Sequence, residues 1–144
     1  MRRALALAAA LSLCATVAYG HITVAPALSK RASQETYTLN VPTEGASPTT
    51  AVELDVPAGV EIVSVEAPAS EHKVVKVDGR TVSITWKVDI PPGQSRKLVF
   101  TALNPKKGER IQWNAHQIFA DGSRADWVEG PGTRRPAPST RLSD

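Results

Sequence analysis

The chain is poor in sulfur and in aromatic side chains. Its 144 residues include one cysteine, one methionine and 5% aromatic residues, although 42% of all residues are hydrophobic. A single cysteine excludes a scaffold held together by disulfides. The aliphatic content excludes a wholly disordered chain, and the length allows one globular domain at most. The sequence therefore predicts a small soluble domain with appendages at its ends.

The first appendage is the long apolar run at the N-terminus. Met1, Arg2 and Arg3 precede an uninterrupted small and apolar segment, residues 4–17, and Ala18-Tyr19-Gly20 follows it. The run is shorter than the roughly 20 residues that a membrane-spanning helix needs, and small residues stand at the −3 and −1 positions of a cleavage site. We therefore expect residues 1–20 to be a signal peptide, with His21 as the new N-terminus.

Cleavage at this position changes the expected chemistry of the remaining chain. It removes the only methionine and the only cysteine, so no soft sulfur ligand remains. Arg2 and Arg3 also account for two of the three net positive charges, so the basic character is no argument for nucleic-acid binding. No second long apolar run follows. We expect a periplasmic or secreted protein with no nucleic-acid partner and no membrane anchor in the mature chain.

Apolar and polar residues alternate with a period of two, which is typical of half-buried strands. The pattern occurs in residues 35–41, 51–56, 82–88, 98–102 and 111–119, and turn-forming Pro-Gly, Asp-Gly and Lys-Gly combinations separate these segments. No long segment has the apolar stripe of a helix. The sequence predicts an all-β fold, an antiparallel immunoglobulin-like β-sandwich over residues 21–129. Residues 130–144 lack an apolar pattern and are expected to form a disordered tail.

Two predicted hairpins place candidate site residues next to one another. If residues 21–25 pair antiparallel with residues 35–41, His21 lies close to Pro42, Thr43 and Glu44. If Asp121-Gly122 forms a two-residue turn, His116 lies opposite Trp127 on the same face of the sheet.

An N-terminal histidine offers its α-amine and its imidazole Nδ1 to one metal ion in a six-membered chelate. Nitrogen donors of this kind suit Cu(II), which prefers a tetragonal plane and heads the Irving–Williams order. A carboxylate would complete the plane, with Glu44 best placed and Glu53 or Glu35 as alternatives. The alternative interpretation of His21 is that it is simply the first residue after a cleavage site.

Several sequence blocks carry a family resemblance. They are His21-Ile22-Thr23-Val24, residues 35–44, residues 49–54, Ile84-Thr85-Trp86, Ile90-Pro91-Pro92-Gly93, residues 113–123 and Trp127. In order and spacing they resemble the YcnI-like family of bacterial extracytoplasmic copper-binding domains, over nearly the whole of the predicted domain.

The resemblance implies an immunoglobulin-like sandwich that binds one Cu(II) through a histidine brace built on a single histidine. By this resemblance His21 supplies the amine and the imidazole, Glu44 completes the site, and Trp127 lies close to the metal. The chain departs from the family pattern at His116, which stands where an aromatic residue is usual. If His116 is the neighbour of Trp127, it offers a second imidazole near the copper.

We therefore expect an exported Cu(II)-binding protein that buffers, stores or delivers copper, with copper-transport or copper-delivery proteins as partners and with no enzymatic activity. One alternative is a copper-dependent oxidase, which requires His116 or His72 at the metal. Another is a metal-free immunoglobulin-like module that binds a partner through its strand edges.

Overall fold

The computed structural model describes residues 20–144, which form twelve strands. In chain order the strands are β1 (Thr23–Ala25), β2 (Leu28–Lys30), β3 (Gln34–Pro42), β4 (Thr49–Asp55), β5 (Glu61–Val65), β6 (His72–Val77), β7 (Arg80–Ile90), β8 (Ser95–Leu103), β9 (Arg110–Gln112), β10 (Ala115–Phe119), β11 (Arg124–Trp127) and β12 (Ser139–Ser143). Apart from Gly20, the predicted signal peptide lies outside the described residues. Within the described range there is no helix long and apolar enough to cross a membrane.

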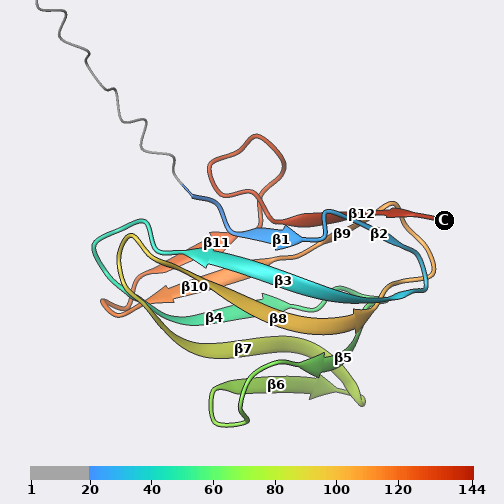
Figure 1. Cartoon of the computed structure of the whole chain (residues 1–144), viewed down its shortest axis with the longest axis horizontal. Helices are drawn as coiled ribbons and strands as arrows, with labels where there is room; N and C mark the ends of the chain where they lie inside the picture. Colours follow the sequence, from blue (N-terminus) through green and yellow to red (C-terminus); the bar gives the residue numbers. More distant parts are fainter. Residues whose placement is uncertain (1–19) are drawn as a thin grey trace, which may run out of the picture.

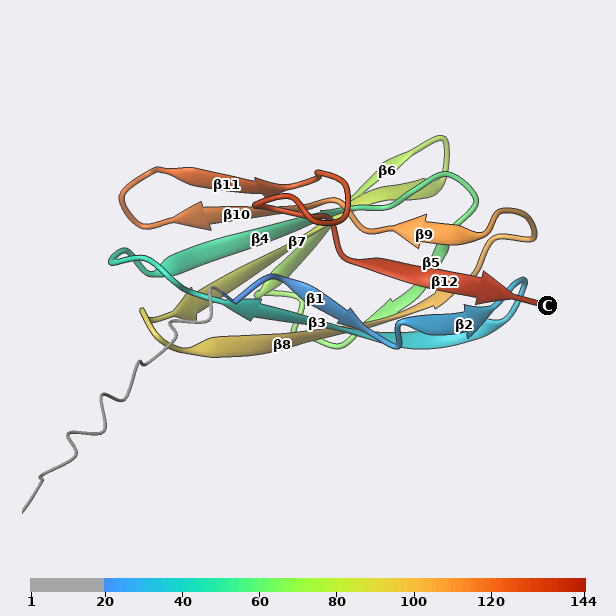
Figure 2. The ribbon, with the colours of Figure 1, turned by 90° about the horizontal axis from the view of Figure 1, so that it is seen from above.

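Two sheets form the layers of a sandwich (Figure 1 and Figure 2). One sheet has the strand order β1-β3-β8-β5 and the other has the order β11-β10-β4-β7-β6. All neighbouring strands within these two sheets are antiparallel. The period-two alternation of the sequence buries one face of each sheet against the other. The prediction of an all-β, antiparallel sandwich is confirmed.

The few aromatic residues are concentrated in the core between the layers. Tyr37 on β3, Phe100 on β8 and Trp113 after β9 are fully buried. Their ring centroids lie 4.9 Å apart for Tyr37 and Trp113, 5.4 Å for Phe100 and Trp113, and 5.6 Å for Tyr37 and Phe100. Aromatic pairs at such distances contribute about 0.5–1.5 kcal/mol each beyond their buried area. Trp86 on β7, in the other sheet, lies 6.2 Å from Phe100, so an aromatic cluster joins both sheets.

A third sheet, of order β2-β12-β9, has the C-terminal strand β12 at its centre. Strand β12 pairs in parallel with β2 and antiparallel with β9, and its residues Thr140 and Leu142 are 0% and 6% exposed. The prediction that residues 130–144 form a disordered tail is therefore wrong for the last part of that segment. The error has a physical cause: β12 is short, and the strands that stabilise it come from distant parts of the chain.

The segment of residues 111–119 is not one strand but two. β9 and β10 are separated at Trp113 and Asn114, where the Trp113 N–H donates to the carbonyl of Pro138 (2.8 Å) and the Asp55 N–H donates to the carbonyl of Asn114 (2.9 Å). The chain therefore passes at this point from the sheet that contains β12 to the sheet that contains β4.

The hairpin between β10 and β11 has a register different from the predicted one. The Phe119 N–H donates to the carbonyl of Ser123 (3.0 Å), so three residues, 120–122, form the loop, and Gly122 adopts a φ of +84°. Trp127 is therefore opposite Ala115, and His116 is opposite Asp126. The predicted pairing of His116 with Trp127 is wrong by one residue. Because side chains alternate between the faces of a strand, the shift places His116 and Trp127 on opposite faces of the sheet.

Candidate metal centre

The position of His21 follows from the register of β1 and β3. Thr23 is paired with Asn40, Val24 with Leu39 and Ala25 with Thr38. Continuing this antiparallel register by two residues brings His21 alongside Pro42, at the end of β3 and two residues before Glu44. The predicted proximity of His21 to the segment that begins at Pro42 is confirmed.

Glu44 lies against the backbone that leads into His21. Its Oε1 accepts a hydrogen bond of 2.8 Å from the N–H of Gly20. A Cβ atom on Gly20 would lie only 2.6 Å from the same oxygen. The carboxylate of Glu44 therefore lies against the backbone at residue 20, where an added side chain would require the Glu44 side chain to move.

Trp127 forms the wall next to His21. Its ring centroid lies 5.8 Å from that of the imidazole, with the two planes tilted by 59°, and only 8% of the residue is exposed. The Trp127 Nε1–H donates to Oε1 of Gln117 (3.2 Å). The Gln117 amide nitrogen donates in turn to the carbonyl of Pro42 (2.9 Å) and to Oγ1 of Thr49 (2.7 Å). Gln117 therefore fixes the indole relative to the end of β3.

Gln117 is not among the candidate site residues that the sequence patterns single out. The sequence does contain one indication of this role, which is the position of Gln117 in the alternation of buried and exposed residues. Gln117 follows Ala115 on the buried side of β10 and is only 2% exposed. A buried amide needs partners for all its donors and acceptors, which is a reason to expect a positioning role.

These residues surround one cleft of about 660 Å³, which we call the His21 cleft. It is lined by His21, Pro42, Glu44, Gln117, Trp127 and Arg135, among others. Arg135 belongs to the loop between β11 and β12, which lies next to β1 (Figure 1). The cleft thus combines an imidazole, a carboxylate and an indole at the N-terminal end of the domain.

The two alternative glutamates do not line this cleft. Glu35 lies at the opposite end of β3 from Pro42, where its Oε2 accepts a hydrogen bond of 2.8 Å from the hydroxyl of Ser29. Glu53 lies on β4, paired with His116 in the register of the sheet. Of the three glutamates considered from the sequence, Glu44 is the one that the fold brings to His21.

His116 belongs to a different group of side chains, on the outer face of the five-stranded sheet. Its Nδ1 lies 2.6 Å from Oδ1 of Asp126, and its Nε2 lies 2.8 Å from Oδ2 of Asp55. Ligand atoms of Glu53, Asp55 and His116 lie within 4.8 Å of one another. We call Glu53, Asp55, His116 and Asp126 the His116 cluster. The prediction that His116 lies beside Trp127, as a second imidazole at the same metal, is wrong, because the two side chains lie on opposite faces of the sheet.

The surroundings of His116 change its protonation. Burial of the ring disfavours the charged form, but the hydrogen bonds to Asp55 and Asp126 outweigh it, so the pKa of His116 is raised. The pKa of Asp126 is lowered by its hydrogen bonds to His116 and Arg124. The cluster therefore favours a positive charge on the imidazole.

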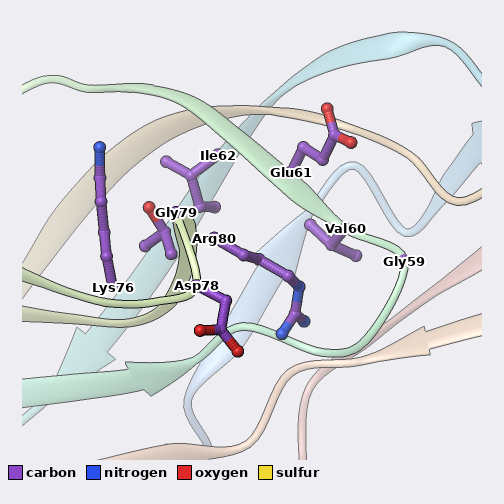
Figure 3. Close-up of a pocket in the computed structure, with 9 residues that line it drawn as sticks. Gly59, Val60, Glu61, Ile62, Lys76, Asp78, Gly79 and Arg80 are labelled. Atoms are coloured by element: carbon purple, nitrogen blue, oxygen red, sulfur yellow. The ribbon is translucent and has the colours of Figure 1, made fainter.

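The third histidine and a second hollow lie elsewhere. His72 begins β6, the edge strand opposite β11, and its Nδ1 lies 2.9 Å from the carbonyl oxygen of Pro68. A hollow of about 480 Å³ lies between the start of β5 and the turn from β6 to β7 (Figure 3). Its Arg80 donates to the carbonyls of Val56 (3.2 Å) and Pro57 (2.7 Å), which gives this side chain a structural role.

The fold and the donor set define a small β-sandwich domain with a candidate metal site at its N-terminal end. The chain belongs to the family described as "Domain of unknown function (DUF1775)", whose profile matches residues 64–142.

Among known proteins, the chain is 37% identical over 130 residues to the copper-binding protein CutI of Bacillus subtilis (strain 168). The match covers 88% of this chain and 64% of CutI, so the chain spans less than two thirds of its relative. The chain is a homologue of a copper-binding protein, and the resemblance to the YcnI-like family is confirmed.

Two solved structures show the same architecture. A protein from Nocardia farcinica with an immunoglobulin-like fold matches with a TM-score of 0.74 and 26% identity, over 86% of this chain and 99% of that chain. A non-cellulosomal cohesin from Archaeoglobus fulgidus matches with a TM-score of 0.50 and 11% identity, over 86% and 91% of the two chains, which is a likeness of fold alone. The immunoglobulin-like character predicted from the sequence is confirmed.

Proposed function

We propose that this chain is an exported Cu(II)-binding protein that buffers, stores or delivers copper, without enzymatic activity of its own. One copper ion is held by the α-amine and imidazole of His21 and by Glu44, after cleavage between Gly20 and His21, in the periplasm or outside the cell. The observation that carries this proposal is the meeting of His21, Glu44 and Trp127 in one cleft. The homology to a copper-binding protein supports it.

The donor chemistry fits Cu(II). The amine and Nδ1 of one histidine close a six-membered chelate, and two nitrogens with one carboxylate oxygen occupy three positions of a tetragonal plane. The carboxylate also offsets part of the ion's charge. A remaining position is available to a ligand from a copper-transport or copper-delivery protein, which is what release to a partner requires.

The hydrogen bond from Gly20 links processing to binding. Before cleavage, the Glu44 carboxylate accepts the N–H of Gly20. Removal of Gly20 deprives the carboxylate of this donor and makes the nitrogen of His21 a free amine next to it. Cleavage thus creates one ligand and frees another in the same step.

The geometry gives less support to the two alternatives. An oxidase with a second histidine requires His116 or His72 at the copper, and neither of these lines the His21 cleft. His116 is bonded to two carboxylates on the other face of its strand, and His72 is on the far edge of the sheet. A metal-free interaction module gives no reason for Glu44 and Trp127 to surround an N-terminal histidine.

The test is titration of Cu(II) into the chain that begins at His21, followed by electron paramagnetic resonance and tryptophan fluorescence. We expect one ion per chain, with nitrogen hyperfine coupling and quenching. Acetylation of the His21 amine or substitution His21→Ala should abolish this binding, because either change breaks the chelate. The matched control is His72→Ala, which removes an imidazole outside the cleft and should leave binding unchanged.

Equal affinity in the acetylated and free forms would refute the amine ligand. Absence of copper binding in both forms would refute the whole proposal and leave the interaction module.

A further inference from the structure

We propose that Glu53, Asp55 and His116 form a second metal site, on the outer face of the five-stranded sheet, that binds a divalent transition-metal ion independently of His21. This inference does not depend on the proposed function, because none of its residues lines the His21 cleft.

The ligands are carried by two neighbouring strands inside the sheet. His116 on β10 is directly opposite Glu53 on β4, and Asp55 lies two residues further along β4 on the same face. Each of these strands has a neighbour on both sides. Sites on paired strands hold their side chains more accurately than sites on loops, so little ordering is needed when an ion binds.

Asp126 on β11 orients the imidazole. Its Oδ1 lies 2.6 Å from Nδ1 of His116 and accepts a second hydrogen bond of 2.7 Å from Nε of Arg124. This leaves Nε2 of His116 facing Asp55. Metal-binding histidines almost always donate their other ring N–H to a carboxylate, a backbone carbonyl or water, and Asp126 supplies such a carboxylate here. Asp126 is thus a positioning residue and not a ligand.

The spacing of the ligand atoms suits bonds of transition-metal length. Nε2 of His116 and Oδ2 of Asp55 are 2.8 Å apart. Two ligand atoms bound at about 2.05 Å to one ion are about 2.9 Å apart at a right angle and about 3.3 Å apart in a tetrahedron. A shift of a few tenths of an ångström therefore admits an ion, and the flexible side chain of Glu53 can close the third position.

The charges of the cluster also favour a divalent cation. Three carboxylates, of Glu53, Asp55 and Asp126, are gathered around His116 and Arg124. The three carboxylates, the Arg124 guanidinium and a protonated imidazole together carry one net negative charge. Replacing that proton by a divalent ion makes the group neutral. Asp55 is 46% exposed, so an ion has a path from solvent.

One nitrogen and two carboxylate oxygens indicate the class of ion. Ca²⁺ and Mg²⁺ prefer oxygen ligands alone, whereas Zn²⁺ binds imidazole and carboxylate together. Zn²⁺ is therefore the probe that separates this site from a Cu(II) site built on an amine.

The experiment uses the chain that begins at residue 21 with His21→Ala, which removes the chelating histidine of the first site. Zn²⁺ is titrated by calorimetry, and the ring signals of His116 are followed by NMR. We expect one Zn²⁺ per chain and a shift of the His116 signals. Glu53→Gln, which spares both His116 hydrogen bonds, and Asp55→Asn should each weaken binding at least tenfold. The matched control Glu61→Gln removes an exposed carboxylate outside the cluster and should have no effect.

Loss of binding on His72→Gln, with Glu53→Gln behaving like the control, would place the Zn²⁺ elsewhere and overturn the proposal. Absence of Zn²⁺ binding would show a structural ion-pair cluster only. Circular dichroism of Asp55→Asn separates loss of a ligand from loss of the fold, and Glu53→Gln tests the site if Asp55→Asn fails to fold. Copper binding at the His21 amine succeeds or fails separately from each of these results.

Discussion

His21 and His116 are held by the fold in opposite ways. His21 is exposed two residues before β1 begins, with the indole of Trp127 as its ring neighbour at 5.8 Å. His116 has a side chain that is 12% exposed and is bonded through both ring nitrogens to carboxylates. The first imidazole is free to exchange a ligand with solvent or a partner, whereas the second is already committed to a network.

The difference shows what each arrangement is suited to. An exposed histidine beside one carboxylate can gain and release an ion with little rearrangement, which suits cargo. A histidine fixed between carboxylates is preorganised, but the network must exchange a proton for any ion that binds. Substitutions in each region therefore have separable effects on copper affinity and on stability.

The largest effect on stability is expected at Gln117, in the wall of the His21 cleft. Gln117→Leu removes the hydrogen bonds to Pro42, Thr49 and Trp127 and leaves buried polar groups unpaired, which should destabilise the fold by about 2–4 kcal/mol. Urea unfolding measures this loss. The control Gln112→Leu alters an exposed glutamine on β9 and should change stability by less than about 0.5 kcal/mol. Similar losses in both variants would contradict the positioning role of Gln117.

The next effect sharpens the difference in copper affinity between the two regions. Glu44→Gln, in the chain that begins at His21, removes the charge of the carboxylate in the cleft and should weaken Cu(II) binding about 10–100-fold, or about 1.4–2.8 kcal/mol. Competition with a chelator of known affinity measures the change. Glu35→Gln, at the opposite end of β3, should bind copper like the unaltered protein. Weaker copper binding by that variant would contradict the assignment of Glu44 as the carboxylate ligand.

The pH dependence of stability tests the His116 network in metal-free protein. Because the pKa of His116 is raised in the folded state above the ordinary value of a histidine, its ion pairs stabilise fully below the unfolded pKa. This contribution is lost as the pH rises through the folded pKa. The free energy of unfolding, compared between the unaltered chain and His116→Gln with a chelator present, should therefore differ most at mildly acidic pH, where the imidazole is charged and the carboxylate of Asp126 is still ionised, and converge at high pH. A difference that grows with pH would reverse the sign of the argument.

The smallest expected effect concerns Trp127. Trp127→Phe keeps an aromatic wall beside His21 but removes the hydrogen bond to Gln117, which should destabilise the fold by about 1 kcal/mol. Copper should still bind and give its electron paramagnetic resonance signal. Most of the fluorescence quenching should disappear, because the emission then comes from the core residues Trp86 and Trp113 and not from the indole beside His21. Undiminished quenching would show that a core tryptophan, not Trp127, reports the metal.

Two Asp-Gly turns show where prediction from sequence succeeds and where it fails. Asp78-Gly79 forms a two-residue turn, with both residues at positive φ and Val77 paired with Arg80. Asp121-Gly122 belongs to a three-residue loop, in which Oδ1 of Asp121 accepts the N–H (2.9 Å) and the hydroxyl (2.6 Å) of Ser123. The same dipeptide permits either turn. The difference of one residue in loop length decides whether His116 and Trp127 lie on the same face of the sheet.

The site at His21 was accessible from the sequence because it depends on local order along the chain. A short strand at the N-terminus, its antiparallel partner and the Pro42-to-Glu44 segment that follows require only neighbouring strands to pair. Gln117 and the His116 cluster were not accessible in this way. They depend on β10 lying between β4 and β11, which joins positions more than sixty residues apart in the case of His116 and Asp55.

The amino-acid sequence by itself identified the core-facing side chains of β3, β4, β7 and β8, since alternation with a period of two places one face of such a strand against the core. It also predicts which histidine a signal-peptide cleavage would expose. Tertiary structure decided the order of the strands, the inclusion of β12 in a sheet and the separation of His116 from Trp127. The physical reason is that alternation and turn propensity are local properties, whereas the pairing of distant strands is selected by the total burial and hydrogen bonding of the whole domain.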